Sequence, residues 1–130
     1  MNHEEPSERL WRFAARIGNV VDALPDTRRG RHVAGQLVRC GTPAPPNYDE
    51  GSAAESRADF AHKLNAALKE LVETRGWLRF IVIAELLPAK RMEELLDECD
   101  QPCRILGKSV STAKSKGRKN DKGGGDASRN

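Results

Sequence analysis

The chain has 130 residues, of which 38% are hydrophobic, 5% aromatic and 32% charged, with a formal net charge of +3. This length forms a single domain, and the scarcity of aromatic residues means that aliphatic side chains on helices must build the core. An odd number of cysteines, a polar acidic N-terminal segment and no long apolar run exclude a disulfide scaffold and a membrane span. We therefore expect a soluble, reduced, cytoplasmic protein with no membrane partner.

The first predicted helix begins at Ser7 and ends before Pro25, because the residue before a proline disfavours the helical conformation. Its apolar residues recur every three or four positions and so share one face. They are Leu10, Phe13, Ile17, Val20, Val21 and Leu24.

A second helix is predicted to follow a cap at Asp26 or Thr27 and to bury Val33, Leu37 and Cys40. Its first turn also carries a basic cluster made of Arg28, Arg29 and Arg31. Positive charge opposes the helix dipole there, so these arginines either face an acidic partner or form a solvated surface cluster. Gly41 and the prolines at 43, 45 and 46 are predicted to break this helix.

The third predicted helix opens with the capping pair Ser56 and Asp59 and runs to about Leu87, just before Pro88. We expect Trp77 to be largely buried against the first or fourth helix. The predicted inner stripe is Phe60, Leu64, Ala67, Leu71, Thr74, Leu78 and Ile81.

A fourth helix carries apolar residues at heptad-like spacing, namely Met92, Leu95, Leu96, Cys99, Cys103, Leu106 and Val110. Residues 114–130 contain four glycines and no large apolar side chain, so we expect a disordered tail. The predicted fold is therefore all-α: an antiparallel up-down-up-down four-helix bundle over residues 1–113, with a proline-broken second helix and a tail at 114–130.

Four consecutive apolar residues, Phe80 to Ile83, point to all sides of the third helix. One bundle core covers only part of that circumference, which predicts self-association. The alternative is that the third helix is central at this end of a monomer.

The segment from Gln36 to Leu78 resembles the bacterial four helix bundle protein family, also called the large-subunit rRNA intervening-sequence proteins. Pro43, Ala44, Pro45 and Pro46 depart from the family pattern, and so does the tail. The matching positions are Gln36, Leu37, Arg39, Gly41, Thr42, Asn47, Tyr48, Glu50, Asp59, Phe60, Lys63, Leu64, Leu68, Lys69, Glu70, Glu73, Thr74, Trp77 and Leu78.

The resemblance implies an up-and-down bundle that assembles into a ring-shaped homopentamer. It also implies a fold similar to that of the accessory variability protein of diversity-generating retroelements, which works with nucleic acid through a positively charged ring. The family has no established enzymatic activity, so the resemblance implies a protein that is not an enzyme.

The proline-rich break and the third helix carry five polar residues that we predict to form a structural network, namely Arg39, Asn47, Glu50, Glu70 and Glu73. Such a network satisfies backbone groups that lack helical partners. The alternative is a ligand or catalytic site that uses these carboxylates, but no histidine or serine nucleophile accompanies them. We predict no catalytic residue, no metal site and no cofactor.

Charge is concentrated in the tail, where six basic residues and two acidic ones give +4 and leave −1 for residues 1–113. A flexible basic segment binds phosphates by counterion release without reading sequence. RNA or DNA is therefore one predicted partner, and a structural or protein-interaction scaffold is the alternative. The predicted contacts are the basic cluster, Arg28, Arg29 and Arg31, with Lys114, Lys116, Arg118, Lys119 and Lys122.

Overall fold

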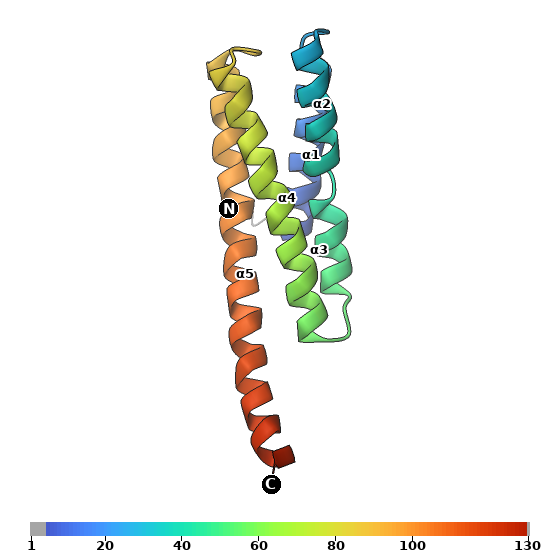
Figure 1. Ribbon diagram of the computed structural model, residues 1–130, viewed down its shortest axis with the longest axis vertical. Helices are drawn as coiled ribbons and strands as arrows, with labels where there is room; N and C mark the ends of the chain where they lie inside the picture. The colour runs from blue at the N-terminus through green and yellow to red at the C-terminus, as the bar shows by residue number, and fades with distance from the viewer. Residues whose placement is uncertain (1–4, 130) are drawn as a thin grey trace.

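The structure is a computed structural model that describes the backbone of residues 5–129 and the side chains of residues 5–112 and 115. Every regular element among residues 5–129 is a helix (Figure 1). The elements are α1 (Pro6–Ala23), α2 (Arg28–Gly41), α3 (Ala44–Ser52), α4 (Arg57–Ile83) and α5 (Ala89–Arg129). The prediction of an all-helical bundle is confirmed.

The long helix α4 contacts α2, α3 and α5, and α1 contacts the same three helices. Figure 1 shows α4 and α5 side by side, running in opposite directions from the turn that joins them. In the same view α2 and α3 follow one another along one side of the bundle, and α5 extends beyond the other helices at its C-terminal end. The core therefore lies along α4, with α5 on one side and the α1 to α3 segment on the other.

The core is aliphatic, and each predicted stripe contributes to it. Leu37, Leu64, Leu71, Leu78 and Ile81 have no exposed surface. The same cluster includes Leu10, Phe13, Ile17, Val20, Val33, Met92, Leu95, Cys99, Leu106 and Val110. The periodicity of the apolar residues thus determines which face of each helix is buried.

The proline-rich segment departs from the prediction because it begins a helix as well as ending one. α2 stops at Gly41, and α3 starts at Ala44 with prolines in its first turn. The first N–H groups of a helix have no intrahelical acceptor, so Pro45 and Pro46 cost α3 no hydrogen bond. Asn47 is already helical, with its N–H 3.1 Å from the Pro43 carbonyl oxygen. Asn47 and Glu50, which the sequence placed in a break, therefore lie in a helix.

The third predicted helix, which ends at about Leu87, is about four residues too long, because α4 ends at Ile83. Glu85 has a φ of 57°, and the N–H groups of Glu85 and Leu86 bond the carbonyls of Val82 and Ile81. These two bonds make a Schellman motif, which usually has glycine at the left-handed position. Since this chain has glutamate there, the sequence carries no visible stop signal before Pro88.

Trp77 is partly buried against the core, and the ring that it contacts on another helix belongs to α2. The indole meets the His32 ring edge-on at 5.7 Å between centroids and the Phe80 ring at 5.6 Å. The ring contacts of Trp77 are thus with α2 and with its own helix, whereas the sequence predicted packing against the first or fourth helix. Because α2 packs directly on α4, residue 77 lies at the rim of that contact instead of in the core.

The backbone of α5 is helical through Arg129, while the sequence predicts a tail from Lys114. Apart from Ser115, the side chains of the tail lie outside the described residues. Its predicted disorder stays a prediction.

Two glycines of α2 provide a matched test of this packing. A Cβ atom on Gly30 would lie 1.9 Å from the Pro25 carbonyl oxygen, whereas one on Gly35 meets nothing within 4 Å. We expect Gly30→Ala to lower the free energy of unfolding by about 1 to 3 kcal/mol, as overpacking does. Gly35→Ala should raise it by about 0.5 to 1 kcal/mol, because alanine favours the helix. Chemical denaturation of both variants measures the two effects, and equal effects would contradict the close approach of Gly30 to the Pro25 carbonyl.

Candidate nucleic-acid interface

The basic cluster lies in the first turn of α2, where its geometry is determined by a cap. Thr27 Oγ1 accepts a hydrogen bond from the Gly30 N–H at 3.0 Å, so Thr27, one of the two predicted candidates, is the cap. All three arginines are exposed, and Arg31 pairs with Asp26 at 2.7 Å. That pair is well exposed on both sides, so it is weak and leaves the turn strongly basic.

The basic cluster and the tail lie at opposite ends of the molecule. Figure 1 shows the start of α2 at the end of the bundle where α4 gives way to α5, whereas the C-terminus lies far down α5. Within one chain, the two sequence-predicted basic regions therefore cannot contact the same few phosphates. The expectation that they act together applies only to a ligand that spans the bundle or to an assembly of several chains.

The structure adds a third basic feature that sequence reasoning missed. Lys90 and Arg91 are exposed at the start of α5 and line a cleft of about 330 Å³ between α1 and α5. Arg16, Asn19 and Glu94 form the rest of its polar wall, and the buried residues Val20 and Leu95 also line it. The visible signal was the Lys-Arg pair two residues after Pro88, but α1 meets it only in the tertiary structure.

Next to this cleft, α1 and α5 are joined by polar contacts. Arg16 bonds Glu98 and lies 3.5 Å from Glu94. Arg9, two turns before Arg16 on α1, bonds Gln101, about one turn after Glu98 on α5. Because Arg16 already has two carboxylate partners, Lys90 and Arg91 carry most of the free positive charge of the cleft. An anion would therefore bind on the α5 side.

The predicted polar network divides into two parts. Arg39 bonds Glu73 and lies 3.9 Å from Glu70, and it also bonds Gln36 at 2.9 Å. Glu73 in turn accepts the Trp77 indole N–H at 3.2 Å. These contacts join α2 to α4 at the surface of the bundle.

The other two members of the predicted network lie apart from Arg39. Glu50 pairs with Lys63 at 2.9 Å, and this contact joins α3 to the first half of α4. Asn47 is half-buried within α3. Both residues belong to a regular helix, so they do not satisfy a broken backbone as predicted. The ion pairs of Glu50, Glu70 and Glu73 with Lys63 and Arg39 join helices to one another.

A second missed cluster joins α1 to α3. Asp49 accepts hydrogen bonds from the Ser7 hydroxyl at 2.6 Å and from the Trp11 indole at 2.9 Å. These two bonds stabilise the carboxylate, so they hold the pKa of Asp49 below its usual range. Trp11 is otherwise about half exposed, at 48%. The cluster positions α3 against α1 at the surface.

Two searches of the described residues bear on other classes of site. No group of three or more potential metal-binding side chains occurs among them. No helix in that part of the chain has the length and apolar content needed to cross a membrane.

The helical arrangement and aliphatic core define an all-helical bundle protein. Residues 8–108 match the sequence model of the 23S rRNA-intervening sequence protein family, so the chain belongs to this family. It is also similar to a crystallised protein of unknown function from the S23 ribosomal protein family of Bacteroides thetaiotaomicron. The two are 30% identical with a TM-score of 0.76, over 82% of this chain and 98% of that one. The chain matches no curated protein.

The Asp49 cluster gives a testable pH dependence. Its pKa is lowered in the folded state, so the cluster stabilises the fold above the unfolded pKa of about 3.9 and loses that effect as the pH falls through the lower folded value. We expect Asp49→Asn to be less stable than the wild type at pH 7 and to approach it below about pH 3. Urea denaturation followed by tryptophan fluorescence measures both. A stability difference that is independent of pH would contradict the assignment.

Proposed function

We propose that the protein is a non-enzymatic, cytoplasmic, oligomeric accessory protein that binds RNA or DNA weakly and without sequence preference. The observation that carries the proposal is the charge distribution. Residues 114–130 hold +4, and the rest of the chain holds −1. The family's name refers to 23S rRNA and that of the solved relative to a ribosomal protein, but neither name states what the protein binds.

Three basic features support binding to a phosphate backbone. The tail supplies most of the net charge, the basic cluster adds exposed arginines at the start of α2, and the cleft adds Lys90 and Arg91 at the start of α5. The last two lie at the same end of the bundle (Figure 1), although Asp22, Asp26 and Glu85 reduce the net charge there. None of the basic segments contains an aromatic residue, so base stacking is not expected and specificity should be low.

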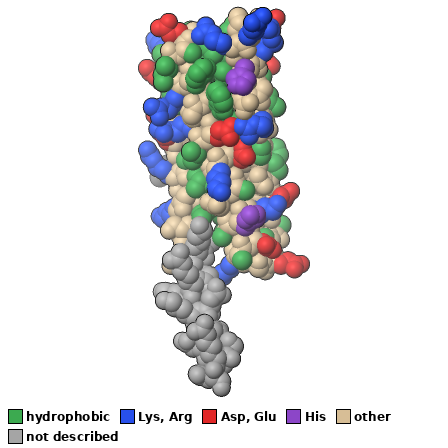
Figure 2. Space-filling view, viewed as in Figure 1, with side chains coloured by type: hydrophobic (Ala, Val, Ile, Leu, Met, Phe, Trp, Pro, Cys, Tyr) green, Lys and Arg blue, Asp and Glu red, His purple; other side chains and the backbone are tan. Residues whose placement is uncertain are grey.

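Self-association is proposed through the outer face of α4. Val72, Phe80 and Ile83 are exposed on this face at 57%, 40% and 76%, and Gly76 lies between them. Val38 of α2 is also exposed, at 49%, and α2 packs on α4. Figure 2 shows hydrophobic side chains gathered on the upper part of this face. Large exposed apolar side chains on one helix favour a protein partner, and a pentamer is what the family resemblance implies.

Assembly into a ring would also strengthen binding to nucleic acid. Several weak phosphate contacts on one ring act together and gain avidity without new contacts in any one subunit. The α2 cluster and the tail, which are separated within one chain, could then each form a band of positive charge. The alternative function, a structural or protein-interaction scaffold, uses the same apolar α4 face but needs no basic tail.

The role of the tail in binding can be tested by removing its charges without changing the length of the chain. We expect replacement of its six basic residues by glutamine to weaken binding to unrelated oligonucleotides and to flatten the salt dependence. Each lost phosphate contact removes about 0.9 from the slope of log affinity against log salt. A second full-length variant, with Arg28, Arg29 and Arg31 changed to glutamine, should lose less. Unchanged affinity in the tail variant contradicts the role of the tail, and a wild type that does not bind at low salt favours the scaffold.

The oligomer can be tested with one charge on α4. We expect the wild type to scatter light as a multiple of 14.4 kDa and Ile83→Glu to shift it toward the monomer, because burying an unpaired carboxylate is unfavourable. Ala15→Glu is the matched control, since Ala15 is exposed on α1. A wild-type mass near that of one chain would refute the proposed self-association. Equal effects of the two glutamates would place the interface elsewhere.

A further inference from the structure

The cleft between α1 and α5 differs from the other basic features because its polar groups converge from two helices. Arg16 and Asn19 line it from α1, whereas Lys90, Arg91 and Glu94 line it from α5. Buried apolar side chains complete the lining. Its volume of about 330 Å³ is at the lower end of the range for small-ligand pockets, so it can hold a phosphate group with the sugar attached to it.

The two cations on the α5 side of the cleft have no counterion. Within the part of the chain whose side chains are described, neither Lys90 nor Arg91 has an ion pair or a side-chain hydrogen bond, and both are exposed. Glu94 is the one carboxylate among the residues that line the cleft, and it pairs with Arg16. The positive charges of Lys90 and Arg91 are therefore available to an anion.

Arg16 is held by its two carboxylate partners to different extents. It bonds Glu98, whose side chain is 21% exposed, through one terminal nitrogen. The other terminal nitrogen lies 3.5 Å from Glu94, whose side chain is 80% exposed. An ion pair with so exposed a carboxylate contributes little free energy. An anion in the cleft can therefore replace Glu94 at this nitrogen, while Glu98 keeps the guanidinium in position.

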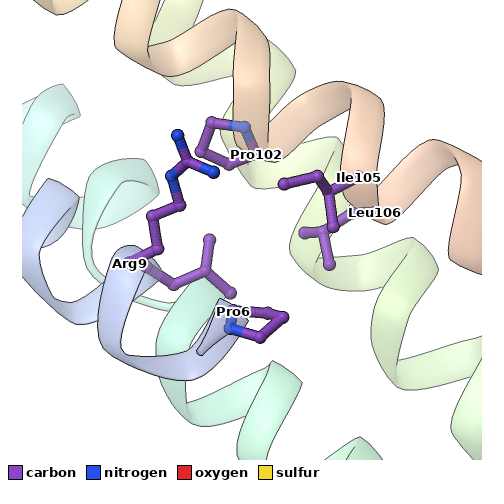
Figure 3. Close-up of a pocket in the computed structure, with 6 residues that line it drawn as sticks. Pro6, Arg9, Pro102, Ile105 and Leu106 are labelled. Carbon is purple, nitrogen blue, oxygen red and sulfur yellow. The ribbon is translucent and has the colours of Figure 1, made fainter. Parts of the chain in front are cut away.

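A second hollow between the same two helices offers a comparison. Figure 3 shows Arg9 extending across it from α1 toward Pro102 of α5. The Arg9 guanidinium bonds the neutral side chain of Gln101, and every other residue that lines this hollow is apolar. One cation beside an apolar surface does not favour an anion with two charges. Among the two hollows, only the Lys90 and Arg91 cleft combines several cations.

The charge and shape of this cleft favour a terminal phosphate over a phosphate within a strand. A phosphate monoester carries a charge of about −1.5 to −2 at neutral pH, whereas each backbone phosphate carries a single negative charge. Two cations without counterions match the higher charge. A terminal phosphate also has the strand on one side only, so it can enter a cleft between two helices more readily than a phosphate that is flanked on both sides.

We propose that this cleft binds the terminal phosphate of a nucleic-acid strand, an inference that rests on the nucleic-acid binding proposed above. Lys90 and Arg91 contact the phosphate from α5. Arg16 exchanges Glu94 for a phosphate oxygen, and the Asn19 amide supplies a further donor. The basic cluster lies at the same end of the bundle (Figure 1), so a strand that leaves the cleft can continue toward it. A protein without base specificity would thereby prefer phosphorylated ends.

The test uses three single-stranded oligonucleotides of one sequence, with a phosphate at the 5′ end, at the 3′ end or at neither end. At near-physiological salt we expect the wild-type protein to bind one of the phosphorylated strands about three- to tenfold more tightly than the unphosphorylated one, as one or two exposed ion pairs provide. Equal affinity for all three strands would overturn the terminal-phosphate site and leave non-specific binding intact. Absence of binding to any strand would overturn both proposals.

A nucleoside monophosphate distinguishes a strand end from a free nucleotide. It shares the phosphate monoester but cannot reach the basic cluster, so we expect it to bind more weakly than the phosphorylated strand. At high concentration it should compete for the cleft and remove the preference for that strand, whereas the unphosphorylated nucleoside should not. Binding as tight as that of the strand would identify a free nucleotide as the ligand and overturn the assignment to a strand end.

Charge-matched variants separate the cleft from the overall charge of the protein. The double substitution Lys90→Gln and Arg91→Gln should abolish the preference for the phosphorylated strand. Arg28→Gln with Arg29→Gln removes the same charge at the same end of the bundle, so it should weaken binding of all three strands but keep the preference. All four side chains are exposed, and circular dichroism checks that the variants are folded. Equal loss of preference in both variants would refute the assignment to the cleft.

The exchange at Arg16 has its own test, with a change of the opposite sign. Glu94→Gln removes the competing carboxylate and should increase the preference by about two- to fivefold, the contribution of one exposed ion pair. Glu93→Gln is the matched control, because Glu93 is exposed on the same turn of α5 and does not line the cleft. Equal effects of the two substitutions would show that Arg16 does not exchange Glu94 for the phosphate.

Discussion

The structure depends on the burial of one long aliphatic stripe along α4. Leu64, Leu71, Leu78 and Ile81 have no exposed surface, and the helix that carries them contacts α2, α3 and α5. Each such side chain contributes about 1.5 to 3 kcal/mol when it is fully buried. The buried residues of the other helices belong to the same core. The other helices can bury their own stripes only against α4 or against one another.

The ends of the helices decide where the charges lie. Thr27 begins α2 and thereby places the arginine cluster at the end of the bundle where α4 stops. The Schellman motif after Ile83 turns the chain so that Lys90 and Arg91 begin α5 at this same end. The tail is carried to the opposite end because α5 runs back along α4. These hydrogen bonds at helix ends therefore determine that positive charge occupies two separated regions, which a single phosphate segment cannot join within one chain.

Contacts around the core are polar and differ from one pair of helices to another. Arg39 with Glu73 joins α2 to α4, Arg16 with Glu98 joins α1 to α5, and Asp49 joins α3 to α1. Ion pairs near the surface contribute little free energy, but together with the Asp49 hydrogen bonds they define which helix faces meet. The outer face of α4 has no such contact at Phe80 and Ile83, and its apolar side chains remain available to a second protein surface.

Taken alone, the sequence determined the helical class, the buried face of each helix, the Thr27 region as a cap and the family, because periodicity and capping are local properties of the chain. It could not determine that Pro45 and Pro46 begin a helix, since prolines disrupt a helix interior but not its first turn. Nor could it show that α4 ends at a glutamate in the left-handed conformation, or that Trp77 lies at the rim of the α2 contact. Only the tertiary structure brought Arg16 close to Lys90 and Arg91. It also divided the predicted polar network and placed the basic regions at opposite ends. Each of these results depends on which helices pack together.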